Sequence, residues 1–209
     1  MSNPNPQGKG LVPVLAHWQA TRPRAVRAKA PAELLLDLFA STLVLSARFD
    51  FRPVVGQRYY LYHGAGDWRL SLIAPEEWGA RAPGACLGLC TLRADMTWSV
   101  EADQAVNDNP ALRARVAALA EDFLGRLDVD GTLAEQLPGY RRDLPYYRRL
   151  LACGVGASLR QSLSAAGSDA LGARESLRLG AETLVRGVLT HGRGPGDPTH
   201  GGEHEEKPL

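Results

Sequence analysis

The feature that most restricts the fold of this chain is a series of strand-like segments between residues 57 and 101, joined by short connections. Aromatic side chains favour pleated strands, and the first segment carries Tyr59, Tyr60 and Tyr62. Gly64 to Asp67 has the composition of a hairpin turn. The predicted strands are residues 57–63, 68–74, 86–93 and 97–101. Because these connections are too short for a helical crossover, they predict a four-stranded antiparallel meander.

Helical patterns flank the predicted sheet on both sides. Pro31 suits the first turn of a helix and Glu33 suits its positive end. Leucines on nearly every side of residues 34–45 indicate that this helix is buried on most of its surface. After the strands, apolar side chains recur at helical spacing, which predicts helices over residues 110–127, 145–167 and 170–189. The predicted fold class is therefore α+β, with a small antiparallel sheet packed against several helices.

The 209 residues are few enough for one hydrophobic core, and the formal charge of +1 offers no global field for nucleic acid or acidic membranes. Residues 1–30 contain no acidic side chain, and we interpret them as a basic N-terminal arm. Residues 31–190 are predicted to form a single α+β domain. Residues 191–209 are mostly Gly, Pro, His and Glu, which cannot bury enough apolar surface, so we expect a disordered tail.

Three observations concern the cellular compartment. The longest apolar run, residues 34–45, contains Asp37 and is shorter than the roughly 20 residues that a membrane-spanning helix needs. The first residues include no signal-peptide core. The cysteines are three, and an odd number argues against a disulfide scaffold. We therefore expect a soluble, cytoplasmic protein with no membrane contact.

An ordered set of short motifs in the strand region resembles a known family. In chain order these motifs are Tyr59-Tyr60-Leu61-Tyr62, a glycine turn, Leu70 to Gly79, Leu87-Gly88 and Asp95-Met96-Thr97-Trp98. The pattern is similar to the uncharacterised family called domain of unknown function 2452 (DUF2452), and Ile73 to Gly79 is its most specific part. The family has no established activity. The resemblance therefore implies a shared fold unit and a cytoplasmic location, and it implies no reaction.

The turn Pro75–Gly79 is the most conspicuous candidate for a ligand or partner surface. Trp78 could stack on a ligand while Glu76 or Glu77 accepts its hydrogen bonds, and we group Tyr62 with them. The structural alternative is that Pro75 begins a tight turn, the glutamates lie at its positive end and Trp78 covers the sheet edge. We favour the structural interpretation, because a motif alone is poor evidence of function.

Four arginines near the predicted helix start at residue 145 form a second candidate. They are Arg141, Arg142, Arg148 and Arg149. Cations are disfavoured at the positive end of a helix. Such a conflict can mark an anion site built from helix amides and guanidinium groups. The alternative is a solvated arginine face that pairs with Asp143 and Glu135.

Cysteine and histidine patterns predict no metal site. Cys86 and Cys90 are four residues apart on a predicted strand, about 13 Å, which is too far for a disulfide or a shared metal. His191, His200 and His204 fall in the predicted tail, which lacks the fixed geometry of a structural metal site. The sequence has no phosphate loop, nucleophile elbow or zinc-protease motif. We therefore predict no catalytic residue, no metal and no cofactor.

Our leading functional hypothesis is a non-catalytic binding or adaptor module, in which the sheet and the Pro75–Gly79 turn contact an unknown protein partner. One alternative is an enzyme with a pocket between sheet and helices near Glu76 and Trp78. Its acid, base or orienting groups would come from Glu76, Glu77, Tyr62 and Asp95. A weaker alternative is a nucleic-acid or ribosome-associated factor, which would use Arg22, Arg24, Arg27, Lys29 and the Arg141–Arg149 cluster. An adaptor predicts an exposed apolar patch, whereas an enzyme predicts a deep pocket with converging polar groups.

Overall fold

The computed structural model describes residues 15–189 of the chain. The first fourteen residues of the predicted basic arm lie outside this range. The predicted disordered tail and its three histidines lie outside it as well.

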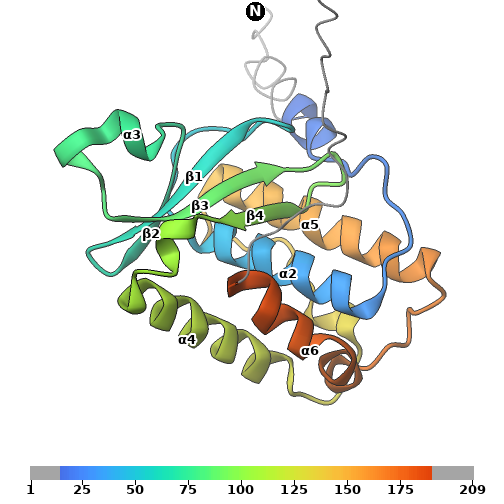
Figure 1. Ribbon diagram of the computed structural model, residues 1–209. Helices are drawn as coiled ribbons and strands as arrows, with labels where there is room; N and C mark the ends of the chain where they lie inside the picture. Colours follow the sequence, from blue (N-terminus) through green and yellow to red (C-terminus); the bar gives the residue numbers. More distant parts are fainter. Residues whose placement is uncertain (1–14, 190–209) are drawn as a thin grey trace, which may run out of the picture.

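Helix α2 (Pro31–Ser46) forms the centre of the fold. It lies under the sheet, and three further helices pack around it (Figure 1). These are α4 (Pro110–Leu127), α5 (Tyr146–Ala165) and α6 (Ala173–Leu189). Leucines on most sides of α2 are buried, as predicted, and Phe39 packs edge-on against Phe123 of α4 with ring centroids 5.2 Å apart.

Four antiparallel strands form one sheet, which with the helices confirms the predicted α+β class. The strands are β1 (Arg58–Gly64), β2 (Asp67–Ser71), β3 (Ala85–Leu92) and β4 (Trp98–Ala102). The simple meander order is wrong, because the strands are arranged β2-β1-β3-β4. The connection between β2 and β3, residues 72–84, is long enough to carry the chain past β1 to its other edge. This connection contains the short helix α3 (Pro75–Trp78).

The sheet has an inner face that packs on α2 and an outer face on the opposite side. Tyr59 and Leu61 of β1 and Trp98 of β4 are inner-face residues and are almost completely buried. Alternation along the strand places Tyr60 and Tyr62 on the outer face. Tyr60 is half-buried, whereas Tyr62 is only 1% exposed. The segment that covers Tyr62 is therefore part of the folded structure and not a free loop.

A partly buried network of charged side chains links the segment before α2 to the turn between β3 and β4. The Lys29 ammonium lies 2.7 Å from a carboxylate oxygen of Asp37 and 2.5 Å from one of Asp95. The Arg93 guanidinium pairs with Asp37 and donates to the Thr97 hydroxyl. Lys29 is only 5% exposed. This residue of the predicted basic arm is therefore buried.

Two glycines allow α5 to approach neighbouring loops closely. A Cβ on Gly156 would lie 1.9 Å from the Pro138 carbonyl oxygen, and one on Gly154 would lie 2.8 Å from that of Thr21. The sequence predicts that these small residues permit close helix packing. The segments that approach them are instead the loop before α5 and the end of the helical segment at residues 15–20.

Candidate functional site

Residues 72–84 form a corner that covers part of the outer face of the sheet, and we call them the α3 corner. The predicted return strand over residues 68–74 is wrong at its end, because β2 stops at Ser71. The Ile73 amide donates to the Ser71 hydroxyl at 3.0 Å, and the Ile73 carbonyl accepts from the Tyr62 hydroxyl at 2.9 Å. Both backbone groups of Ile73 are therefore bound by side chains, so the strand pairing does not continue.

Three of the four predicted surface residues make contacts that hold the α3 corner in place. Tyr62 and Trp78 meet edge-on with ring centroids 6.3 Å apart. Burial raises the pKa of Tyr62 well above its usual value, so its hydroxyl stays neutral and can donate to Ile73. Glu77 accepts a hydrogen bond from the Ala74 amide at 3.2 Å at the start of α3. The contact of Glu77 fits the structural interpretation of the turn, in which the glutamates lie at its positive end.

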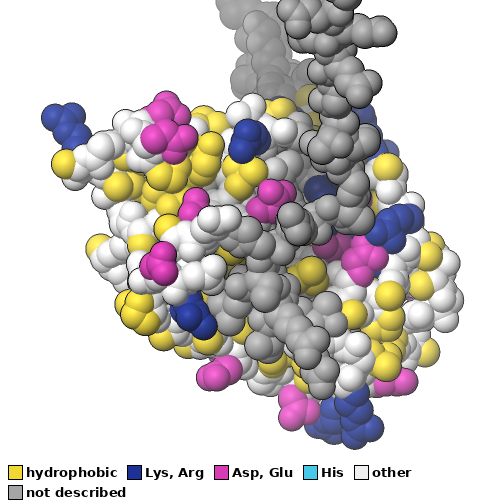
Figure 2. All heavy atoms as spheres, in the orientation of Figure 1, with side chains coloured by type: hydrophobic (Ala, Val, Ile, Leu, Met, Phe, Trp, Pro, Cys, Tyr) yellow, Lys and Arg dark blue, Asp and Glu magenta, His cyan; other side chains and the backbone are white. Residues whose placement is uncertain are grey.

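Glu76 is exposed and lines a broad groove on the outer face of the sheet. The groove also contains Glu101 and Asp103, and Arg58 lies among its other lining residues. Figure 2 shows acidic side chains scattered among apolar ones over the face that carries α3. Within residues 15–189, no group of three or more His, Cys, Asp or Glu side chains is placed to hold a metal ion.

Trp78 lines a different groove, of about 690 Å³, which we call the edge groove. It runs along the side of β2 away from β1, where the α3 corner meets the segment after α2. Its apolar residues are Phe49, Phe51, Leu70, Leu72, Ile73 and Trp78. Leu72 and Ile73 are 51% and 38% exposed, because they follow the last residue of β2 and face neither the core nor another strand.

Three arginines also line the edge groove, and among residues 15–189 the acidic residue that lines it is Asp50. The Arg48 backbone bonds to the side of β2 that β1 does not use: its amide donates to Trp68 at 2.8 Å. Arg69 projects from β2 itself, and Arg148 comes from the first turn of α5. The Arg148 guanidinium donates to the Ala47 carbonyl at 3.3 Å. The groove therefore combines an apolar floor with excess positive charge.

The four arginines of the predicted anion site do not form one cradle. Arg141 pairs with Asp143 at 2.5 Å, and Arg142 is exposed. Arg149 donates to the carbonyls of Arg142 and Leu144 and to the Tyr140 hydroxyl. Arg148 lines the edge groove instead. The structure thus brings together one residue from each predicted site, Trp78 and Arg148. Anion binding by the full set stays a prediction.

The start of the described chain contacts the segment that carries these arginines. His17 Nδ1 lies 3.2 Å from the Tyr146 hydroxyl, and the Trp18 and Tyr140 rings are stacked with centroids 6.5 Å apart. The described part of the predicted basic arm therefore meets this segment at His17 and Trp18. This proximity leaves nucleic-acid binding as an untested prediction.

The groups named for an enzymatic alternative lie in different surroundings. Tyr62 and Glu77 bind backbone of the α3 corner, and Glu76 lines the outer-face groove. Asp95 lies at the β3–β4 turn, bound to Lys29. Cys86 lies beside Glu76 in the outer-face groove, and burial raises its pKa to about 11, so it is a neutral thiol.

Sequence reasoning missed Arg48, Arg69, Leu72 and Ile73 as groove residues. One signal was present: Leu72 and Ile73 are adjacent bulky apolar residues just before Pro75, so they could not both face the core of a strand. The positions of Arg48 and Arg148 depend on tertiary contacts that carry no local signal. None of the helices within residues 15–189 is long and apolar enough to cross a membrane.

Residues 29–117 match the family model described as protein of unknown function (DUF2452). The match confirms, over these residues, the resemblance seen in the sequence. It contains α2, the sheet, the α3 corner and every edge-groove residue except Arg148. No curated protein and no solved structure matches the chain.

Proposed function

We propose that this protein is a non-catalytic binding module that docks a segment of a protein partner in the edge groove. The segment would carry a large apolar side chain flanked by carboxylates. The observation that carries the proposal is the exposed pair Leu72 and Ile73, held beside Trp78 and surrounded by arginines.

The composition of the groove supports a protein partner. Interface centres are enriched in aromatic residues and arginine and are poor in lysine and acidic residues. Residues that dominate binding energy are most often Trp, Tyr and Arg. Among the described residues, the lining of the edge groove has Trp78 and two phenylalanines, three arginines, no lysine and one acidic residue, Asp50.

The hydrogen bonds that hold the backbone of the groove also support binding, because a preformed surface loses little conformational entropy when a partner docks. Tyr62 fixes the backbone at Ile73, and Ser71 fixes the same residue from the other side. The Arg48 backbone is bound to β2 through Trp68 and Leu70. The apolar side chains are therefore exposed on a well-anchored backbone.

The charge balance defines the kind of partner. Arg48 pairs with Asp67 at 2.9 Å, but both side chains are more than half exposed, so this surface ion pair is weak and can be exchanged. Arg69 and Arg148 add two more cations to the groove. A partner segment with carboxylates on either side of its apolar anchor would complement these guanidinium groups.

A displayed library of random peptides, selected on the full chain, tests the proposal. We expect the selected peptides to share an aromatic or aliphatic anchor next to Asp or Glu. Their affinity for the Leu72→Asp variant should be at least tenfold weaker, because the substitution places a charge in the apolar floor and repels the carboxylates.

Leu179→Asp is the matched control. Leu179 on α6 is 55% exposed, compared with 51% for Leu72, so the two substitutions differ in position and not in chemistry. The control variant should bind the selected peptides like the wild type. Equal affinity of the peptides for the Leu72→Asp variant and the wild type would contradict docking in the edge groove.

A further inference from the structure

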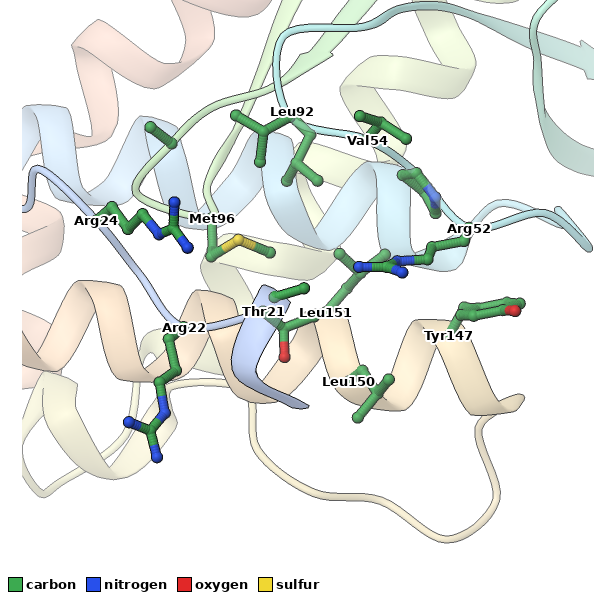
Figure 3. A pocket seen from close by; sticks show the side chains of 14 residues that line it. Thr21, Arg22, Arg24, Arg52, Val54, Leu92, Met96, Tyr147, Leu150 and Leu151 are labelled. Carbon is green, nitrogen blue, oxygen red and sulfur yellow. The ribbon is translucent and has the colours of Figure 1, made fainter. Parts of the chain in front are cut away.

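A separate cavity of about 320 Å³ lies between the chain before α2, the loop before β1 and helix α5. Ligand pockets usually range from about 300 to 1,000 Å³, so this volume suits a small molecule. Its wall is mainly apolar, with Val54, Leu92, Met96, Leu150 and Leu151 among the lining residues (Figure 3). None of these residues lines the edge groove.

Arginines supply the charge of this cavity. Figure 3 shows the guanidinium groups of Arg24 and Arg52 pointing toward one another across it, whereas the side chain of Arg22 points away. Within the described part of the chain, no acidic side chain lines the cavity, and no ion pair engages Arg24 or Arg52. Two cations therefore border an apolar space, and no acidic side chain of residues 15–189 pairs with them.

The backbone around the cavity is held by defined contacts. The Arg24 amide donates to the Ala94 carbonyl at 2.9 Å, which ties this segment to the β3–β4 turn. In the same turn Met96 has a φ of 68°, a conformation that is unfavourable for a residue with a side chain. Its side chain is nevertheless almost fully buried and lines the cavity. The turn thus places an apolar side chain against the space that the arginines border.

We infer that this cavity binds a small amphiphilic anion, a carboxylate or phosphate group attached to an apolar body. The apolar body would lie against Met96, Leu92 and Leu151, where burial of its surface is favourable. The anionic head would lie between Arg24 and Arg52, since guanidinium groups bind carboxylates and phosphates through charge-assisted hydrogen bonds. The inference is independent of docking in the edge groove.

Four probes test this chemistry on the full chain by titration calorimetry, below the concentrations at which they form micelles. Decanoate and decyl phosphate carry both parts of the inferred ligand. Decanol carries the apolar body alone, and inorganic phosphate carries the anion alone. We expect the two amphiphilic anions to bind at least tenfold more tightly than either partial probe. Binding of decanol as tight as that of decanoate would overturn the role of the arginines.

Variants locate the anionic head. Arg24→Gln and Arg52→Gln should each weaken decanoate binding about tenfold or more, the effect of losing one charge-assisted hydrogen bond of about 1.5–3 kcal/mol. Arg22→Gln makes the same charge change beside the cavity, but its side chain points away, so it should weaken binding less than threefold. An equal loss in all three variants would show general charge attraction and overturn the site. Leu72→Asp should leave decanoate binding unchanged, so a failure here is distinct from a failure in the edge groove.

Discussion

At the scale of single residues, buried charge is the main feature that sets this core apart from a purely apolar one. Lys29, Asp37, Asp95 and Arg93 balance two cations against two carboxylates. Such a network can be replaced by apolar residues in some proteins, but removal of one partner leaves an uncompensated charge at a cost of about 3–5 kcal/mol. The network therefore ties the chain before α2 to the β3–β4 turn as long as all its members are charged.

The titration of Asp95 makes one part of this network testable. Burial alone raises the pKa of Asp95, but Lys29 and two hydrogen bonds from Thr97 outweigh it, so the pKa of the folded state is lower than usual. The unfolded chain then binds the proton more readily than the folded one. This stability is present above the unfolded pKa of about 4 and is lost as the pH falls through the folded value.

We therefore expect the free energy of unfolding, measured with urea, to fall as the pH is lowered below about 4. In the Asp95→Asn variant, the free energy of unfolding should decrease less steeply with falling pH, because the contribution of Asp95 is gone. At neutral pH this variant should be less stable than the wild type. The same acid slope in wild type and Asp95→Asn would show that Asp95 does not contribute.

At the scale of elements, helix α5 can pack close to neighbouring loops because it has glycine at the points of contact. The Pro138 carbonyl occupies the space where a Cβ of Gly156 would lie, at 1.9 Å. Gly125 of α4 has no atom within 4 Å of its Cβ position and is exposed. Both glycines lower the stability of their helix by a similar amount relative to alanine. They differ in the space around the Cβ position, which is open at Gly125 and occupied at Gly156.

Alanine substitution should separate the two positions. Gly125→Ala should raise the free energy of unfolding by about 1 kcal/mol, because alanine is the better helix former. Gly156→Ala should lower it by about 1–3 kcal/mol, because the loop before α5 must move to relieve the overlap. Urea denaturation of both variants measures the difference. An increase in stability for Gly156→Ala would contradict the close approach.

Much of the element pattern follows from the sequence because it depends on local signals. Periodicity and prolines predict α2 and α4 to within a residue or two, and the tyrosine-rich segment predicts β1. Strand order does not follow, since a connection that passes β1 and one that returns beside β2 need similar lengths. The end of β2 was also missed, because it depends on Tyr62 binding Ile73 across the sheet.

At the scale of the whole molecule, the elements place two binding surfaces apart from each other. The edge groove lies beside β2, and the cavity lies beside the β3–β4 turn and α5. The sequence singled out Trp78 and Arg148 separately, but their meeting depends on how α5 packs beside the segment after α2. A partner that docks in the edge groove and a ligand in the cavity would therefore contact different residues of the chain.

The measurement that tests the proposed docking most directly is site-specific photo-crosslinking in extract from the native cells. A photoreactive phenylalanine analogue replaces Leu72 in one sample and Leu179 in the other, and the crosslinked peptides are identified by mass spectrometry. The account predicts one main partner from position 72, attached through a segment with an apolar residue beside Asp or Glu, and no such product from position 179. Equal products from both positions, or none from position 72, would contradict it.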